Sequence, residues 1–142
     1  MAEVSGKPTK FQATAKATEP AQIWSLWTDV DSWPSWDQGV KKASLDGPMT
    51  VGARGSIIDQ NDRASNFEVI KIDPGKSFVF ATRLPGGQMI MIRELDEENI
   101  THRVLITGIA KNIFGAMLGR PNMELIGVSV DELISLAQSR AG

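Results

Sequence analysis

The stretch IWSLWTDVDSWPSW, residues 23–36, contains all four tryptophans of the chain. Ile23, Trp24 and Trp27 recur at helical spacing, which predicts one broad apolar helix face. Pro34 does not fit inside this helix, because a proline ring removes one backbone hydrogen bond and clashes with the preceding turn. The sequence therefore predicts two short helices in succession.

Strand-like segments lie on both sides of these helices. Residues 11–17 (FQATAKA) alternate apolar and polar side chains, as a half-buried strand does, and residues 1–8 are expected to be a loose lead-in. Residues 40–108 contain β-branched or aromatic runs of strand length, separated by turn signals such as DPGK, PGG and DEEN. We expect about six antiparallel strands in this region.

The last third of the chain changes to a helical period. Its apolar residues recur at steps of three and four, at Met123, Ile126, Val130, Leu133 and Ala137. This pattern predicts a long amphipathic helix that lies on an apolar surface. The whole order of elements predicts an α+β fold, with the helix packed on one face of an antiparallel sheet.

Composition and charge narrow the classes of function. The chain has 142 residues, which suits one domain over 1–142, and a net charge of −2, which argues against nucleic-acid binding. It has no cysteine, so disulfides and thiolate chemistry are excluded. We find no signal-peptide pattern and no apolar run of membrane-span length, so we expect a cytoplasmic protein.

Residues 23–57 resemble the START-like helix-grip superfamily (SRPBCC, birch-pollen-allergen-like), in its polyketide cyclase/dehydrase and lipid-transfer branch. The shared pattern is a helix, an Asp, Trp-Pro-x-Trp, a strand, and a Val-Gly-x-x-Gly turn into the next strand. ITHRVLITG (residues 100–108), which leads to the terminal helix, resembles it too. The resemblance implies a curved sheet of about seven strands around the C-terminal helix, with an apolar cavity between them. It also implies that the tryptophans close one end of the sheet.

A core role is expected for Trp24 and Trp27. For Trp33 and Trp36, a core role and a position at the cavity mouth both remain open.

The turn signals also predict which side chains share the inner face. A Gly86-Gly87 turn pairs Phe80 with Arg93, and a DEEN tip pairs Arg93 with His102. With a Pro74-Gly75 turn, the predicted inner face contains Phe67, Val69, Phe78, Phe80, Met89, Met91, Arg93, His102, Val104 and Ile106. The other face holds Glu68, Arg83, Glu94 and Arg103, and therefore belongs to water.

From this face and the implied cavity we predict a set of ligand-binding residues. They are Trp36, Phe67, Phe78, Phe80, Met91, Arg93, His102, Val104, Phe114, Met117, Ile126 and Val130. Arg93 and His102 are also the candidate catalytic pair. Either they bind a carboxylate, enolate or phenol in the cavity, or Arg93 reaches solvent or an acidic loop and His102 is a hydrogen-bonded core residue.

Three classes of function follow. The leading one is binding or transport of a small hydrophobic ligand such as a lipid, polyketide or aromatic compound. The second is a cyclase or dehydratase that uses His102 and Arg93. The third is a protein-interaction module or homodimer, in which Ile90, Ile92 and Leu105 form an outer apolar patch. The sequence indicates neither a cofactor nor a metal site, and a monomer and a homodimer are both open.

Overall fold

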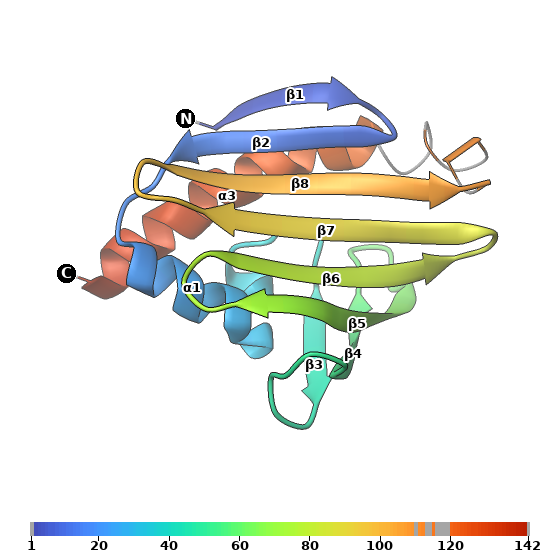
Figure 1. The fold of residues 1–142 in the computed structure, drawn as a ribbon, viewed down its shortest axis with the longest axis horizontal. Coiled ribbons are helices and arrows are strands. Elements are labelled where there is room, and N and C mark those ends of the chain that lie inside the picture. Colours follow the sequence, from blue (N-terminus) through green and yellow to red (C-terminus); the bar gives the residue numbers. More distant parts are fainter. Residues whose placement is uncertain (1, 110, 113–114, 116–119, 142) are drawn as a thin grey trace.

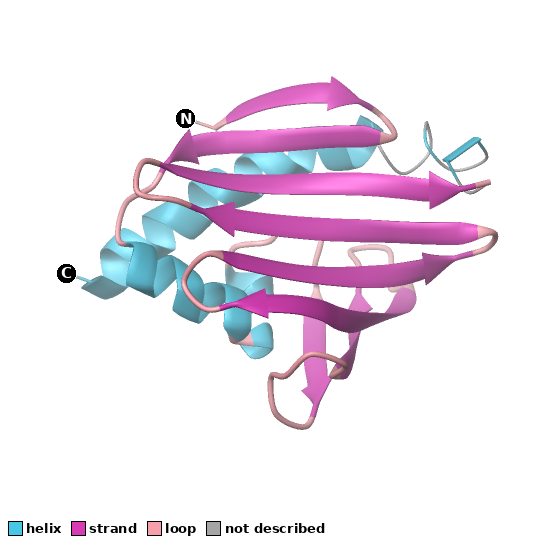
Figure 2. Cartoon of the chain, viewed as in Figure 1, coloured by secondary structure: helices cyan, strands magenta, loops and turns pink. Residues whose placement is uncertain are grey.

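The computed structural model describes residues 2–109, 111–112, 115 and 120–141. The elements are β1 (Glu3–Lys7), β2 (Lys10–Lys16), α1 (Pro20–Thr28), the 3-10 helix η1 (Val30–Ser35), β3 (Lys42–Asp46), β4 (Arg54–Ile58), β5 (Ala64–Asp73), β6 (Ser77–Leu84), β7 (Gly87–Leu95), β8 (Asn99–Gly108) and α3 (Arg120–Ala141). Eight strands form one antiparallel sheet in the order β1-β2-β8-β7-β6-β5-β4-β3. The helices α1, η1 and α3 lie on one side of this sheet, with α3 crossing behind β2, β8 and β7 (Figures 1 and 2). The predicted α+β helix-grip architecture is confirmed.

The N-terminal end differs from the prediction. Residues 3–7 are not a loose lead-in but the edge strand β1, which pairs antiparallel with β2 from Glu3↔Thr14 to Lys7↔Lys10. The sheet therefore has eight strands instead of about seven. The pattern gave no signal because every residue of β1 is exposed, so neither face of the strand is marked by apolar side chains.

The hairpin registers agree with the prediction at one turn and differ at two. Arg93 pairs with His102, as expected from the DEEN tip. The hairpin between β6 and β7 has its turn at Pro85-Gly86, one residue earlier than predicted, so Phe80 pairs with Met91 and not with Arg93. A shift of one residue at the turn moves each pair by two, and strand side chains alternate with a period of two. The predicted inner face is therefore preserved.

A similar compensation occurs between β5 and β6. The turn after Asp73 has three residues, since Asp73 pairs with Ser77, whereas a two-residue turn was predicted. An irregularity between Val69 and Lys71 then restores the expected pairing of Val69 with Phe80. Such a bulge absorbs one extra residue in one strand. Phe67 and Val69 are both buried on the inner face.

An aromatic cluster fills the inner face beneath η1. The Trp33 ring lies 4.9 Å from Phe80, stacked, and 5.3 Å from Phe67, measured between ring centroids. Trp27, Trp33 and Trp36 are fully buried, whereas Trp24 is half-buried. The predicted core role is thus confirmed for Trp27. Trp33 and Trp36, for which a core role and a position at the cavity mouth were both open, lie in the core.

Gly55 in the Val-Gly-x-x-Gly turn makes room for this cluster. A Cβ atom at Gly55 would lie 2.5 Å from Cζ of Phe67 and 2.3 Å from the carbonyl oxygen of Ser44. Gly52 in the same motif adopts a φ of 91°, which favours glycine. The motif therefore has a packing reason as well as a turn reason.

Helix α3 lies nearer one edge of the sheet than the middle. Its principal backbone contacts are with β1, β2 and α1, and η1 contacts β3 at the other end. Ala137 and Leu133, in the second half of α3, are fully buried. Within the described part of the chain, the main backbone contacts of α3 therefore lie away from β6 and β7.

Candidate functional site

A cavity of about 420 Å³ lies between the sheet and the first turns of α3. It is lined by Asp37, Gly39, Val40, Ile57, Asp59, Arg63, Ala64, Ser65, Phe80, Thr82, Arg83, Leu84, Met89, Met91, Arg93, His102, Val104, Asn122, Leu125, Ile126 and Ser129. Its volume falls in the range of about 300–1,000 Å³ that is usual for small-molecule sites. Of the eleven lining residues from β6, β7 and α3, six are apolar and five are polar.

The alternation of β7 and β8 places the central residues of the site. Met91 pairs with Val104, and the next inner-face pair along is Arg93 with His102. Ile126 faces them from α3 and is buried. Methionine side chains are unbranched and flexible, so Met89 and Met91 suit a wall that adapts to a ligand.

Arg93 is buried against aromatic rings. Its side chain is 2% exposed, and its guanidinium carbon lies 4.8 Å from the ring centroids of Trp33, Trp36 and Phe80. Burial lowers the pKa of Arg93 to about 10, against the opposing effect of the Asp37 carboxylate, so the side chain stays cationic at neutral pH. The ring faces supply cation–π attraction in place of water.

The hydrogen bonding of Arg93 is incomplete. Its Nη2 lies 3.6 Å from Oδ2 of Asp37, an ion-pair distance that is too long for a good hydrogen bond. Its Nη1 has no hydrogen-bond partner within the described residues. A buried polar group without a partner costs free energy, and such groups mark places where a further acceptor fits.

His102 is neutral in this environment. Its Nε2 accepts a hydrogen bond of 2.9 Å from Nε1 of Trp27, so the proton of the neutral ring is on Nδ1. Burial, and then the positive charge of Arg93, lower the pKa of His102 well below its usual value. His102 is thus both a hydrogen-bonded core residue and a residue of the cavity wall.

A short hydrogen-bond network ties α3 to the loop that carries Asp37. Ser129 Oγ accepts a bond of 3.0 Å from the Gln38 backbone N–H and contacts Oδ1 of Asp37 at 3.4 Å. The Gly39 backbone N–H also donates to Oδ1 of Asp37, at 3.0 Å. The first half of α3 is therefore anchored beside Arg93.

The predicted site residues fall into three groups. Phe80, Met91, Arg93, His102, Val104 and Ile126 line the cavity. Trp36, Phe67, Phe78 and Val130 are not among the lining residues but are buried in the packed core, where Trp36 lies against Arg93. Phe114 and Met117 lie outside the described residues. For Arg93, the predicted escape to solvent is wrong, whereas the acidic partner from a loop is present as Asp37.

Sequence reasoning missed several lining residues. Ser129 carried a usable signal, since it is a polar residue three positions after Ile126 on the apolar face of α3. Asp37 carried none, because an Asp in a loop is usually a solvated turn residue. Arg83 was assigned to the outer face, yet it borders the cavity near the end of β6.

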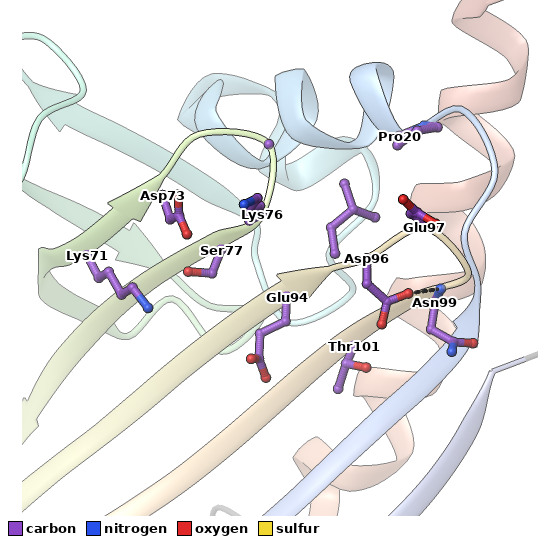
Figure 3. Close-up of a pocket in the computed structure, with 12 residues that line it drawn as sticks. Pro20, Lys71, Asp73, Lys76, Ser77, Glu94, Asp96, Glu97, Asn99 and Thr101 are labelled. Atoms are coloured by element: carbon purple, nitrogen blue, oxygen red, sulfur yellow. Dashed lines mark hydrogen bonds between the residues drawn. The ribbon is translucent and has the colours of Figure 1, made fainter.

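A second hollow lies on the outside of the sheet, beside the turns that precede β6 and β8 and the start of α1 (Figure 3). It is larger, about 620 Å³, but its lining is mainly polar, including Lys71, Asp73, Lys76 and Glu94. The Asp96 carboxylate there accepts backbone hydrogen bonds from Asn99 and Glu98, which lower its pKa. Turn structure and solvation account for these groups, so we take the inner cavity as the candidate site.

Two further observations concern metal binding and membrane spans. Among the described residues, no three His, Asp or Glu side chains come together as a metal-binding group. None of the described helices is long and apolar enough to cross a membrane.

The architecture and the cavity agree with a comparison against protein families. The family described as polyketide cyclase/dehydrase and lipid transport matches residues 8–106, which is more than half of the chain. The chain belongs to this family. A comparison of the chain with curated proteins found no match.

Solved structures of the same fold align with nearly the whole length of this family member. Protein NE0264 from Nitrosomonas europaea has a TM-score of 0.71 at 11% identity, covering 97% of this chain and 100% of its own. TTHA0849 from Thermus thermophilus has a TM-score of 0.71 at 10% identity, covering 94% of this chain and 99% of its own. At these identities the likeness shows the fold alone.

Proposed function

We propose that the protein binds or transports a small hydrophobic ligand in the cavity between the sheet and α3. The observation that carries this proposal is the cavity itself, about 420 Å³ in volume, with apolar side chains from β6, β7, β8 and α3 among its lining residues. A protein core is normally filled to the density of an organic crystal, so a hollow of this size, at the place where the family resemblance implies one, supports a binding role. Membership of the lipid-transport family supports the same class of ligand.

The polar end of the cavity favours a ligand that carries an oxygen atom. Nη1 of Arg93 lacks an acceptor within the described residues, and the proton of His102 is on Nδ1. Both groups are hydrogen-bond donors beside the same apolar wall. Because Asp37 already balances the charge of Arg93, an uncharged or weakly charged oxygen, such as that of a phenol, would complement them.

The pKa values of Arg93 and His102 favour a role in ligand binding over a role in catalysis. A general base works best when its pKa lies near the operating pH. The pKa of His102 is well below its usual value, and Arg93 remains protonated at neutral pH. Neither is then a strong base, so a cyclase or dehydratase remains the weaker alternative.

The protein-interaction role also stays a prediction. Ile90, Ile92 and Leu105 lie on the outer face of the sheet, and Ile90 pairs with Leu105. All three side chains are half-buried, so the apolar strip that they present is small. It supports a partner site less than the cavity supports a ligand.

Filling the cavity tests the proposed function. Ile126→Phe adds volume at the cavity wall, whereas Val128→Phe adds the same ring at an exposed position of α3 outside the lining. We expect the wild type and Val128→Phe to bind decanol and decanoate in calorimetric titrations, and Ile126→Phe to bind both at least tenfold more weakly. Absence of binding to the wild type, or equal binding by Ile126→Phe, would contradict the proposal.

A further inference from the structure

The lining residues divide into a buried end and an exposed mouth. The buried end consists of Val40, Phe80, Arg93, His102, Val104, Ile126 and Ser129. The mouth consists of the exposed lining residues Arg63, Ala64, Arg83 and Leu125. Two of these four are arginines, from the turn before β5 and from the end of β6.

The net charge of the cavity lining is opposite in sign to the net charge of the whole chain. Among the described residues, three arginines and two aspartates line it, and His102 is neutral, so these residues give one net positive charge, three minus two. The whole chain has a net charge of −2. A local field that opposes the overall charge attracts an anion to this place in particular.

Neither aspartate of the described lining forms an ion pair with Arg63 or Arg83. Asp37 lies beside Arg93 at the buried end. Oδ1 of Asp59 accepts hydrogen bonds from the backbone N–H groups of Asn61 and Arg63, at 2.8 and 2.9 Å, and so caps its own turn. In the described part of the chain, neither Arg63 nor Arg83 forms an ion pair.

We propose that Arg63 and Arg83 bind the anionic head group of an amphipathic ligand whose apolar part occupies the cavity. This inference rests on the proposed function and adds the ligand class and its orientation, head at the mouth and tail inside. A guanidinium group offers paired donors that fit the oxygens of a carboxylate or a phosphate. Leu125, 36% exposed at the same mouth, gives the first methylene groups of the tail an apolar contact.

The arrangement also separates the roles of the three arginines. Arg93 is balanced by Asp37 and enclosed by rings, so it favours an uncharged or weakly charged acceptor. The mouth cations are solvated, so a full negative charge placed there keeps part of its hydration. Burying that charge beside Asp37 instead would require its desolvation.

A charge-neutralising double variant tests this inference. We would titrate the wild type and Arg63→Gln/Arg83→Gln with decanoate, decyl phosphate and decanol at two salt concentrations. The substitution at position 63 retains the backbone N–H that binds Asp59. Arg54→Gln is the matched control, because Arg54 is an exposed arginine on β4 that does not line the cavity.

We expect the double variant to bind decanoate and decyl phosphate about three- to tenfold more weakly, since each exposed ion pair contributes modestly. Decanol affinity should not change, and added salt should reduce anion binding only in proteins with both mouth arginines. The tighter of the two anions identifies the head group as carboxylate or phosphate.

The outcomes separate the two proposals. If the double variant binds both anions as the wild type does, while decanol also binds, the mouth assignment is overturned and the proposed function stands. If Arg54→Gln weakens anion binding as much as the double variant, a general charge effect replaces the site. If the wild type binds none of the three probes, the proposed function fails and the mouth assignment fails with it.

Discussion

The inner face of the sheet has two regions that differ in how they are filled. In the packed region, formed by Trp33, Phe67, Phe78 and Phe80, rings contact one another at centroid distances of 4.9–6.3 Å. In the hollow region, formed by Met89, Met91, Val104 and Ile126, flexible and aliphatic side chains surround a cavity. Both regions belong to one sheet, and Arg93 lies between them.

The difference comes from what each helix inserts. η1 brings Trp33 down onto the sheet, where its ring packs against Phe67 of β5 and Phe80 of β6. Trp36, the C-cap residue of η1, packs against Arg93 of β7 and His102 of β8. The described residues of α3 that line the cavity are Asn122, Leu125, Ile126 and Ser129, none of which carries a ring. The principal backbone contacts of α3 with the sheet are at the β1–β2 edge. The size of the side chains placed opposite the sheet therefore decides which part of its inner face is packed and which part borders a cavity.

The largest expected effect is a truncation in the packed region. Trp33→Ala should lower the free energy of unfolding by about 3–5 kcal/mol, because a fully buried ring and its contacts are lost. The Trp33 Nε1 donor to the carbonyl oxygen of Trp27 is lost as well. Urea denaturation measures the change. Trp24→Ala, at a half-buried ring, should cost clearly less, and equal losses would contradict the assignment of Trp33 to the packed region.

A second prediction compares enlargement in the two regions on one helix. Leu133→Phe should destabilise by about 1–3 kcal/mol, because Leu133 is fully buried where no space is left. Ile126→Phe should cost clearly less than Leu133→Phe, because the ring can enter the cavity. Thermal and urea unfolding of both variants checks this. If the two losses were the same, the hollow region would be as tightly packed as the rest.

The smallest effect concerns His102, at the border of the regions. Burial and Arg93 depress its folded-state pKa, so the unfolded chain binds the proton more readily. The stability contribution is complete above the unfolded pKa of about 6.5 and declines as the pH falls below it, by up to about 1.4 kcal/mol per pH unit. Unfolding free energies at pH 7.5, 6.5 and 5.5 measure it.

His102→Gln provides the control for this pH effect. Glutamine supplies an oxygen that accepts the Trp27 Nε1–H bond but does not titrate. Its stability should vary little between pH 7.5 and 5.5, where ordinary carboxylates stay ionised in both states. The same decline in the variant as in the wild type would exclude His102 as the source.

Particular residues show how far sequence reasoning reaches. The inner face was predictable because a turn displaced by one residue keeps the parity of every strand pair, as Phe80 and Met91 illustrate. β1 was not predictable because its exposed residues carry no apolar alternation. Asp37 and the mouth arginines were missed because a solvated loop charge and a site charge look the same in sequence.

The sequence by itself determined the α+β architecture, the hairpin that pairs Arg93 with His102, and the family, because period, turn residues and local motifs act over short distances along the chain. Only the tertiary structure decided which apolar side chains touch rings and which face a cavity. It also decided that Arg93 lies among three rings beside Asp37. These outcomes depend on where η1 and α3 meet the sheet. Local sequence patterns do not determine the free volume that remains between elements far apart in the sequence.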